Sequence, residues 1–235
     1  MKLTINTSFQ ENASSQYLLI LVDSEQLQQS AATYQIDKFE EITTATQYKA
    51  GLNETLALVG NVPASTNACL VGLGKTAELQ PGKLAKVAQT IVKAAQKKFQ
   101  QISVDISALP VQFHNIFALL LTQAAYAFDE FKSKKNEFVL EQINLIATDS
   151  PVTAEQLQLL QAVQTGQNLA RDLGNRPGNI CFPEYLAEQA LALAAEYPEL
   201  LKVNVLDEQQ MADLGMHSFL AVSKGSDRPG RIITI

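Results

Sequence analysis

The chain has 235 residues, 46% of them hydrophobic and 18% charged, a balance typical of globular domains rather than of disordered chains. The formal net charge of −6 disfavours nucleic acid and anionic membranes as partners. Residues 1–15 are too polar for a signal peptide, no apolar run approaches the roughly 18 residues of a membrane span, and Cys69 and Cys181 do not suggest a disulfide scaffold. We therefore expect a soluble cytoplasmic protein.

Apolar runs alternate with helical patterns over the first 150 residues, and most of these runs are continuous. Continuous apolar strands separated by helices are typical of an α/β fold whose mainly parallel sheet is covered by helices on both faces. Asn61–Pro63 and Ser65–Asn67 supply turn residues between the second and third runs. The five predicted strands are Tyr17–Val22, Thr55–Gly60, Ala68–Gly72, Ile102–Ile106 and Ile143–Thr148.

A helix is predicted over Gly82–Phe99, because apolar residues recur on one face at 100° per residue. The opposite face carries a lysine stripe, which is either a solvated helix face or a phosphate-binding patch, and we favour the solvated face. The apolar face consists of Leu84, Val87, Ala88, Ile91, Val92, Ala95 and Phe99, and the stripe of Lys83, Lys86, Lys93 and Lys97.

Two more helices are predicted in the first 175 residues. Gln112–Phe131 contains His114, which we interpret as a packed or surface histidine, since no partner residue has metal-ligand spacing near it. A charged loop, Lys132–Glu137, follows. The second helix covers Thr153–Leu173 and begins with a capping-box pattern, Thr153 with Gln156 three residues on.

A boundary is predicted near Asp149–Val152, where the sheet pattern ends. Residues 1–150 would form an α/β domain, residues 151–174 a bridging helix, and residues 175–235 the start of a second domain. The elements expected there are a helix over Pro183–Tyr197, a strand over Lys202–Leu206, a helix over Glu208–Leu214, and the apolar segments Phe219–Val222 and Arg231–Ile235, the last a buried strand.

The stretch Val71–Thr76 (VGLGKT) could cradle phosphate after a strand. The Walker A spacing would need glycine where Cys69 stands, and the dinucleotide pattern would need glycine where Ala77 stands. A tight strand-to-helix turn is therefore the favoured interpretation. The two histidines, His114 and His217, lie 103 positions apart, and no H-E-x-x-H or G-x-S-x-G motif occurs. No catalytic, cofactor-binding or metal residue is assigned.

The segment NRPGN, Asn175–Asn179, has the residue types of a rigid elbow between domains. Gly174 suits a left-handed position after the preceding helix. Pro177 disfavours the α conformation for the residue before it, Gly178 permits a sharp turn, and Pro183 suits the first turn of the next helix, although Phe182 is a poor N-cap.

Arg171–Ala190 (RDLGNRPGNICFPEYLAEQA) resembles the segment that opens the catalytic domain of the cytosol (leucyl) aminopeptidases, in particular the bacterial aminopeptidase A type. The family pattern N-x-P-x-N, followed by a proline-started helix, is matched by Asn175, Pro177, Asn179 and Pro183. Glu208–Ser226 resembles the next family block. The VGLGK turn and the strand order resemble the family's N-terminal domain, which has a macro-like fold.

This resemblance implies a hexameric exopeptidase that removes leucine and other bulky apolar N-terminal residues from peptides, using two divalent metal ions, Mn or Zn, and a bridging water. The family's ligand and lysine motifs, G-K-G-x-x-x-D-[ST]-G-G and N-T-D-A-E-G-R, do not occur in the sequence. We therefore expect a chain that stops before its catalytic residues, is inactive alone, and leaves the edge of RIITI open to pairing.

Two alternatives remain from the residues themselves. A macro-like domain could bind a nucleotide or ADP-ribose with help from Lys75 and Lys83. The lysine stripe could bind DNA, although the acidic balance argues against it.

Overall fold

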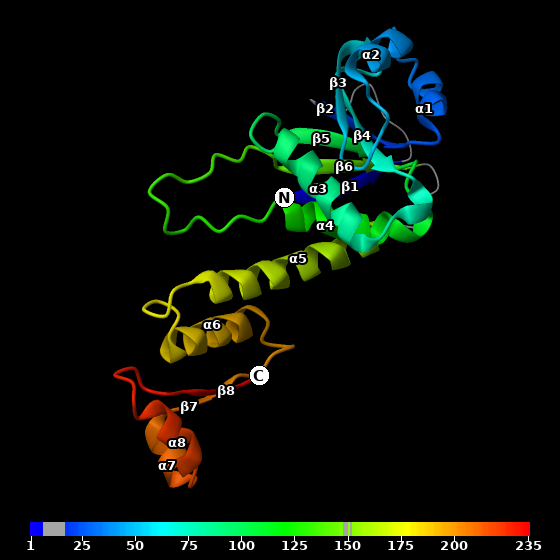
Figure 1. Ribbon diagram of the computed structural model, residues 1–235. Coiled ribbons are helices and arrows are strands. Elements are labelled where there is room, and N and C mark those ends of the chain that lie inside the picture. Colours follow the sequence, from blue (N-terminus) through cyan, green and yellow to red (C-terminus); the bar gives the residue numbers. More distant parts are fainter. Residues whose placement is uncertain (7–16, 148–149, 151) are drawn as a thin grey trace. The chain divides into compact units, whose positions relative to one another are not determined.

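The computed structural model describes residues 1–6, 17–147, 150 and 152–235 and divides into two compact units, Met1–Asn168 and Leu169–Ile235 (Figure 1). The predicted boundary near Asp149–Val152 includes residues 149 and 151, which lie outside the described residues. The domain limits 1–150, 151–174 and 175–235 stay a prediction.

The first unit is built on a six-stranded sheet with the order β1-β6-β5-β2-β4-β3. Only β3 runs antiparallel to its neighbour, β4, so the prediction of a mainly parallel sheet is confirmed. The strands are β1 Lys2–Asn6, β2 Tyr17–Asp23, β3 Thr55–Val62, β4 Ser65–Gly74, β5 Gln101–Asp105 and β6 Gln142–Ile146.

Strand β1 is absent from the predicted strands, because its sequence, KLTIN, lacks a continuous apolar run. It lies at one edge of the sheet and pairs only with β6, in parallel, among the described strands. An edge strand needs fewer apolar residues than a central one, so it gives a weaker signal in the sequence. The last residue of the predicted strand Ile143–Thr148 lies outside the described residues.

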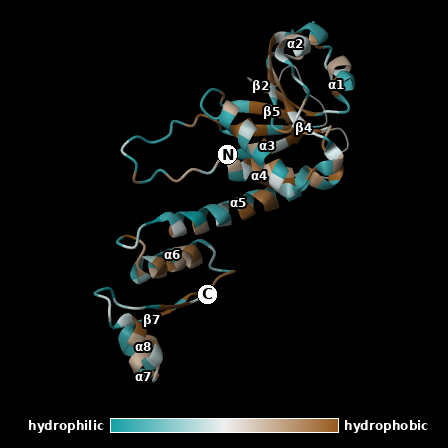
Figure 2. Ribbon diagram, in the orientation of Figure 1, coloured by the Kyte–Doolittle hydropathy of each residue, from teal (hydrophilic) through white to brown (hydrophobic). Residues whose placement is uncertain are grey.

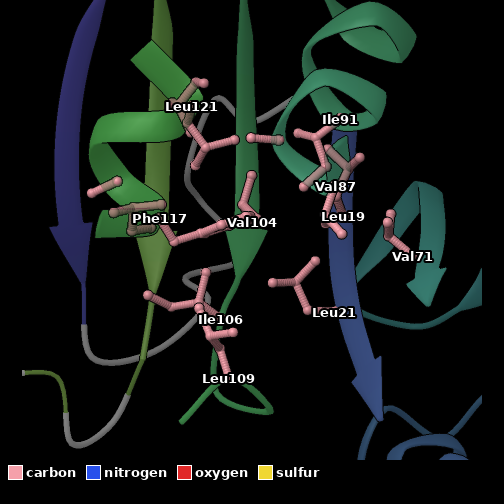
Figure 3. Packing of buried hydrophobic residues seen from close by; sticks show 14 of the residues in the cluster. Leu19, Leu21, Val71, Val87, Ile91, Val104, Ile106, Leu109, Phe117 and Leu121 are labelled. Atoms are coloured by element: carbon pink, nitrogen blue, oxygen red, sulfur yellow. The ribbon is translucent and has the colours of Figure 1, made fainter. Parts of the chain in front are cut away.

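Successive side chains of β2 enter two separate hydrophobic clusters, as the period of two in a strand requires. Leu19 and Leu21 belong to the cluster that also contains residues of helices α3 (Pro81–Ala95) and α4 (His114–Ala124), and Figure 3 shows Leu19 beside Val87 and Ile91 of α3. Leu18 and Ile20 pack on the opposite face with residues of α1 (Leu27–Thr33) and α2 (Phe39–Thr46). Because β2 is buried on both faces, its continuous apolar sequence is explained.

The prediction that β3 is buried on both faces is wrong. Leu56 and Leu58 are buried, whereas Val59 is 70% exposed, because only one face of β3 meets the core. The turn between β3 and β4 is also shorter than predicted. It consists of Pro63 and Ala64, and Ser65–Asn67 already belongs to β4.

Helix α3 buries the predicted apolar face, from Leu84 to Ala95, and ends at Ala95 rather than at Phe99. Phe99 lies beyond the helix, where its ring stacks on Tyr17 at 4.5 Å between centroids. Helix α4 is likewise shorter than predicted. It ends at Ala124, and residues 125–141 form a long connection to β6 in which Phe131 is half exposed (Figure 1). The apolar residues near Phe131 continue the helical pattern of the sequence, but the fold offers them no core surface to cover, so the helix does not extend to them.

Helix α5 spans Ala154–Asn175 and begins with the predicted capping box. The N–H of Thr153 donates to Gln156 Oε1 at 3.0 Å, and the N–H of Gln156 donates to Thr153 Oγ1 at 3.2 Å. The helix runs through Gly174, whose φ is not positive, so the predicted left-handed C′ glycine is wrong. The helix ends because Pro177 lies two residues beyond its last residue, Asn175.

The second unit contains three further helices and a two-stranded antiparallel sheet. The segment Phe219–Val222 lies inside helix α8. RIITI forms a strand, β8, as predicted, but it is not buried: Ile233 is half-buried and Ile235 is 69% exposed. The elements are α6 Pro183–Glu196, β7 Asn204–Leu206, α7 Glu208–Asp213, α8 His217–Ser223 and β8 Ile232–Thr234.

Candidate functional site

The VGLGKT segment forms the end of β4 and a tight turn into a short 3-10 helix, Thr76–Glu78. Gly74 has φ +67°, a conformation that glycine adopts without strain. The N–H of Gly74 donates to Ala50 O at 3.0 Å, and its carbonyl accepts from the N–H of Ser24 at 2.9 Å. These backbone groups of Gly74 are therefore already satisfied by protein atoms.

A carboxylate of the protein accepts hydrogen bonds from the donors of this turn. Asp23, at the end of β2, is 4% exposed and accepts from the hydroxyl of Thr76 at 2.5 Å and from the N–H of Thr76 at 3.4 Å. Its other oxygen accepts from the N–H of Glu25 at 2.8 Å. A buried negative charge repels a second anion. The geometry therefore supports the interpretation of VGLGKT as a structural turn.

Gly72 is required by packing rather than by ligand binding. A Cβ at this position would lie 2.1 Å from the carbonyl oxygen of Gly51, which no rearrangement of a side chain can relieve. The segment Ala50–Glu54 runs directly against β4 here, with the N–H of Asn53 donating to Gly72 O at 2.9 Å. Glycine at position 72 is therefore explained by the close approach of two backbones.

The lysines of the predicted stripe lie on α3 and just beyond its end, on a side that is at least partly exposed. Lys83 pairs with Glu78 at 3.6 Å, and Lys86, Lys93 and Lys97 are at least partly exposed. Lys75, the other candidate cation, pairs with Glu25 at 3.0 Å, which raises the pKa of Lys75. These contacts are typical of a solvated helix face.

His114, predicted to be either a packed or a surface histidine, is packed. It is 2% exposed, and its Nε2 lies 2.8 Å from Leu109 O while Nδ1 lies 3.1 Å from Ser150 Oγ. Since a carbonyl only accepts, Nε2 carries the proton in this arrangement. His217, in contrast, lies at the start of α8 and is not buried.

No group of three or more His, Cys, Asp or Glu side chains in the described part of the chain could hold a metal ion. Cys69 is buried, which raises the pKa of its thiol, and Cys181 is half-buried and unpaired as a disulfide. Across residues 1–6, 17–147, 150 and 152–235, no helix is long and apolar enough to span a membrane.

The NRPGN segment makes the predicted sharp turn after α5. The carbonyl of Pro177 accepts from the N–H groups of Ile180 and Cys181, both at 2.9 Å. Pro183 then begins α6, and Phe182 takes the N-cap position with extended backbone and no side-chain cap, as predicted. The guanidinium of Arg176 lies 5.3 Å from the centre of the Tyr185 ring, which connects the turn to the first turn of α6.

A cluster of polar contacts around Glu208 is not predicted by any pattern in the sequence. Glu208, in the first turn of α7, accepts from Ser223 Oγ at 2.7 Å and from the N–H of Gly230 at 2.9 Å. These hydrogen bonds, together with the charge of Arg231, lower the pKa of Glu208. Asp207, directly before Glu208, forms a capping box with Gln210, as expected of a carboxylate at a helix start.

The segment before β8 is also tied to the start of α6. The guanidinium of Arg228 lies 4.2 Å from the ring centre of Phe182, and Arg231 pairs with Glu184 at 3.6 Å. We call the set Phe182, Glu184, Glu208, Ser223, Arg228, Gly230 and Arg231 the α6–α7 junction. Every carboxylate in it has a partner within the unit, and the contacts hold the segment before β8 in place.

Comparison with protein families gives two matches along the chain. The N-terminal domain of the cytosol aminopeptidase family matches residues 18–135, and the catalytic domain of the same family matches residues 168–235. Probable cytosol aminopeptidases from Acinetobacter baumannii (strain ATCC 17978) and Acinetobacter baylyi are 66% and 60% identical over 235 residues, all of this chain and 49% of each relative. The chain thus spans about half the length of these curated relatives.

Solved structures show the same fold. A tomato leucine aminopeptidase mutant superposes with a TM-score of 0.82 at 20% identity, over 99% of this chain and 50% of the other. The bottromycin maturation enzyme BotP in complex with Mn superposes with a TM-score of 0.72 at 18% identity, over 94% of this chain and 44% of the other.

Proposed function

Because the chain belongs to the cytosol aminopeptidase family, we propose that it is the N-terminal part of a two-metal aminopeptidase that removes leucine and other bulky apolar residues from the N-termini of peptides. The observation that carries this proposal is 66% identity over all 235 residues to a probable cytosol aminopeptidase. The matched residues include both units, and with them NRPGN and the α6–α7 junction.

The residues present do not fit a metal centre, since the described part of the chain brings together no three ligand side chains. No catalytic step is therefore assigned to them. We propose that the metal ligands and the groups that act on the peptide belong to the part that full-length relatives carry beyond the matched half, and that these 235 residues alone are inactive. The Mn bound to BotP supports Mn as the metal of the full-length protein.

The role proposed for the described residues is structural. The first unit would act as the macro-like N-terminal domain, residues 151–174 as the bridge, and residues 175–235 as the start of the catalytic domain. A hexamer in the cytoplasm is proposed for the full-length protein from the family resemblance. The carboxylate of Asp23 at the VGLGKT turn argues against the alternative in which this turn binds a nucleotide.

The experiment is hydrolysis of leucine p-nitroanilide, with and without Mn²⁺, by two proteins. One is the 235-residue chain, and the other is the same chain joined after Ile235 to the remaining half of the A. baumannii relative. We expect Mn²⁺-dependent turnover by the joined protein only, and loss of that turnover on chelation. Turnover by the short chain, or a folded joined protein that releases no leucine, would contradict the proposal.

A further inference from the structure

Helix α5 changes character along its length. Leu157 and Leu160, near its start, pack against the core of the first unit, whereas the next two turns are rich in uncharged polar side chains. Figure 2 shows this change, with hydrophobic colour near the start of the helix and hydrophilic colour over the turns that follow. Four of the polar side chains have the spacing of one helix face, i, i+3, i+4 and i+7, and line one groove. They are Gln161, Gln164, Thr165 and Asn168.

The other wall of this groove is the start of β1. Met1 and Lys2 line the groove there, and its volume is about 520 Å³. A smaller cavity of about 200 Å³ adjoins it, since Met1, Gln164 and Asn168 line both. We call the two cavities together the α5–β1 groove. The apolar and aromatic residues that the loop between α4 and β6 contributes to the smaller cavity are Ala125, Tyr126, Phe138 and Leu140.

The polar groups of the α5–β1 groove have unused bonding capacity. The side-chain amides of Gln161, Gln164 and Asn168 belong to half-buried residues and form no hydrogen bond within the described part of the chain. Lys2 is exposed and belongs to none of the ion pairs among the described residues. Of the described lining residues none is acidic, although the whole chain has a net charge of −6. The groove therefore offers a cation and several amides to an anionic group, beside an apolar cavity.

We propose that the α5–β1 groove binds an apolar residue that carries a free carboxylate, either a free amino acid or the C-terminal residue of a peptide. The ammonium of Lys2 pairs with the carboxylate, the amides of Gln164 and Asn168 bond to the polar atoms beside it, and the apolar side chain enters the smaller cavity. That cavity is smaller than the pockets that hold drug-sized ligands, which suits a single side chain. The site goes beyond the proposed function, since it assigns no hydrolysis to these residues.

The test is an NMR titration of the isotope-labelled 235-residue chain, followed through the side-chain amide signals of its asparagines and glutamines. The probe is N-acetyl-leucine, which has no free α-amino group and is therefore no aminopeptidase substrate. We expect saturable shifts of the Gln164 and Asn168 signals, with a Kd of about 1 mM. N-acetyl-leucinamide, which lacks the carboxylate, and N-acetylglycine, which lacks the apolar side chain, should each bind at least about fivefold more weakly.

Two variants test the assigned contacts. Lys2→Gln should weaken binding of N-acetyl-leucine about fivefold and should bind N-acetyl-leucinamide as the unaltered chain does. Gln164→Ala, which keeps a good helix former in α5, should weaken binding about threefold. The matched controls are Lys93→Gln on α3 and Gln158→Ala on α5. Both positions are exposed and line neither cavity, so these changes should leave binding unchanged.

Free leucine and acetyl-alanyl-leucine distinguish the two sources of the ligand. Tighter binding of leucine indicates a free amino acid, tighter binding of the peptide indicates a C-terminus, and either result supports the site. The absence of saturable shifts at about tenfold the expected Kd, or equal weakening by Lys2→Gln and Lys93→Gln, would overturn it. Because the proposed function is tested by turnover of leucine p-nitroanilide in the joined protein, either proposal can fail without the other.

Discussion

The carboxylate of Glu208 accepts a hydrogen bond from the N–H of Gly230, 22 residues further along the chain, at 2.9 Å. The same oxygen accepts from Ser223 Oγ at 2.7 Å, so one side chain ties the start of α7, the end of α8 and the segment before β8 together. A Cβ on Gly230 would lie 2.9 Å from Cβ of Ser223, which shows how closely these segments approach.

This junction predicts a specific pH dependence. The pKa of Glu208 is lowered in the folded chain, mainly by the Gly230 N–H and Ser223 hydroxyl hydrogen bonds, so the ionised form stabilises the fold. That contribution is complete above the ordinary glutamate pKa, about 4.3, and is lost as the pH falls through the lowered value. We expect the protection factor of the Gly230 amide, its exchange measured by NMR relative to that of an unstructured chain at the same pH, to fall below that pH. In Glu208→Gln the protection factor should show no such step, and a step that persists would contradict the assignment.

The close approach at Gly72 predicts a large loss of stability on substitution. Gly72→Ala places a methyl group 2.1 Å from the backbone oxygen of Gly51, and we expect the free energy of unfolding to fall by about 3 kcal/mol or more. Urea denaturation followed by circular dichroism measures this. Gly82→Ala is the control, since a methyl group there would meet no atom within 4 Å and the residue occupies the first turn of α3. It should be neutral or stabilise by up to about 1 kcal/mol.

The left-handed residue that ends α2 predicts a stabilising change. Gln47 has φ 56° and ψ 25° and is exposed, a conformation that glycine adopts with less strain. We expect Gln47→Gly to raise the free energy of unfolding by about 0.5–1 kcal/mol. Gln29→Gly, inside α1 and also exposed, should lower it by about 1 kcal/mol. Thermal unfolding midpoints that move in the same direction for both variants would contradict this interpretation.

The hydrogen bond between Asp23 and Thr76 predicts both a stability effect and a binding result. Thr76→Val removes a hydroxyl that donates to a buried carboxylate. We expect the free energy of unfolding, measured by urea denaturation, to fall by about 1.5–3 kcal/mol.

Calorimetric titration of the unaltered chain with ADP-ribose should give no saturable heat at high micromolar concentration. Saturable heat that disappears in Lys75→Ala would instead support a nucleotide site at the VGLGKT turn.

Local patterns predict much of the regular structure. The strands of the sheet core, the buried face of α3 and the Thr153 capping box depend on residues that are neighbours in the sequence or one helical turn apart. Errors occur where a distant segment decides the outcome. Val59 is exposed because only one face of β3 meets the core, and α4 ends at Ala124, beyond which the apolar residues continue into a long loop.

The candidate site shows the same division. The NRPGN turn and the Pro183 helix start are predictable because proline restricts its own backbone and that of the preceding residue. The role of Glu208 is not predictable beyond its place at a helix start, since Gly230 lies 22 residues away and no periodic pattern connects the two. A glutamate in a first helical turn is common, so its sequence carries no signal for a distant partner.

The class of fold, the order of most elements and the family resemblance can all be read from short stretches of the chain, because apolar periodicity and turn residues act over short distances. Three features are visible only in the folded molecule. Asp23 accepts hydrogen bonds from the VGLGKT turn, and the backbone of Gly51 approaches Gly72 too closely for a side chain there. Residues 169–235 bury only three side chains. Burial and charge pairing depend on which segments meet in space. That information is distributed over the whole chain and is not readable from any one stretch of it.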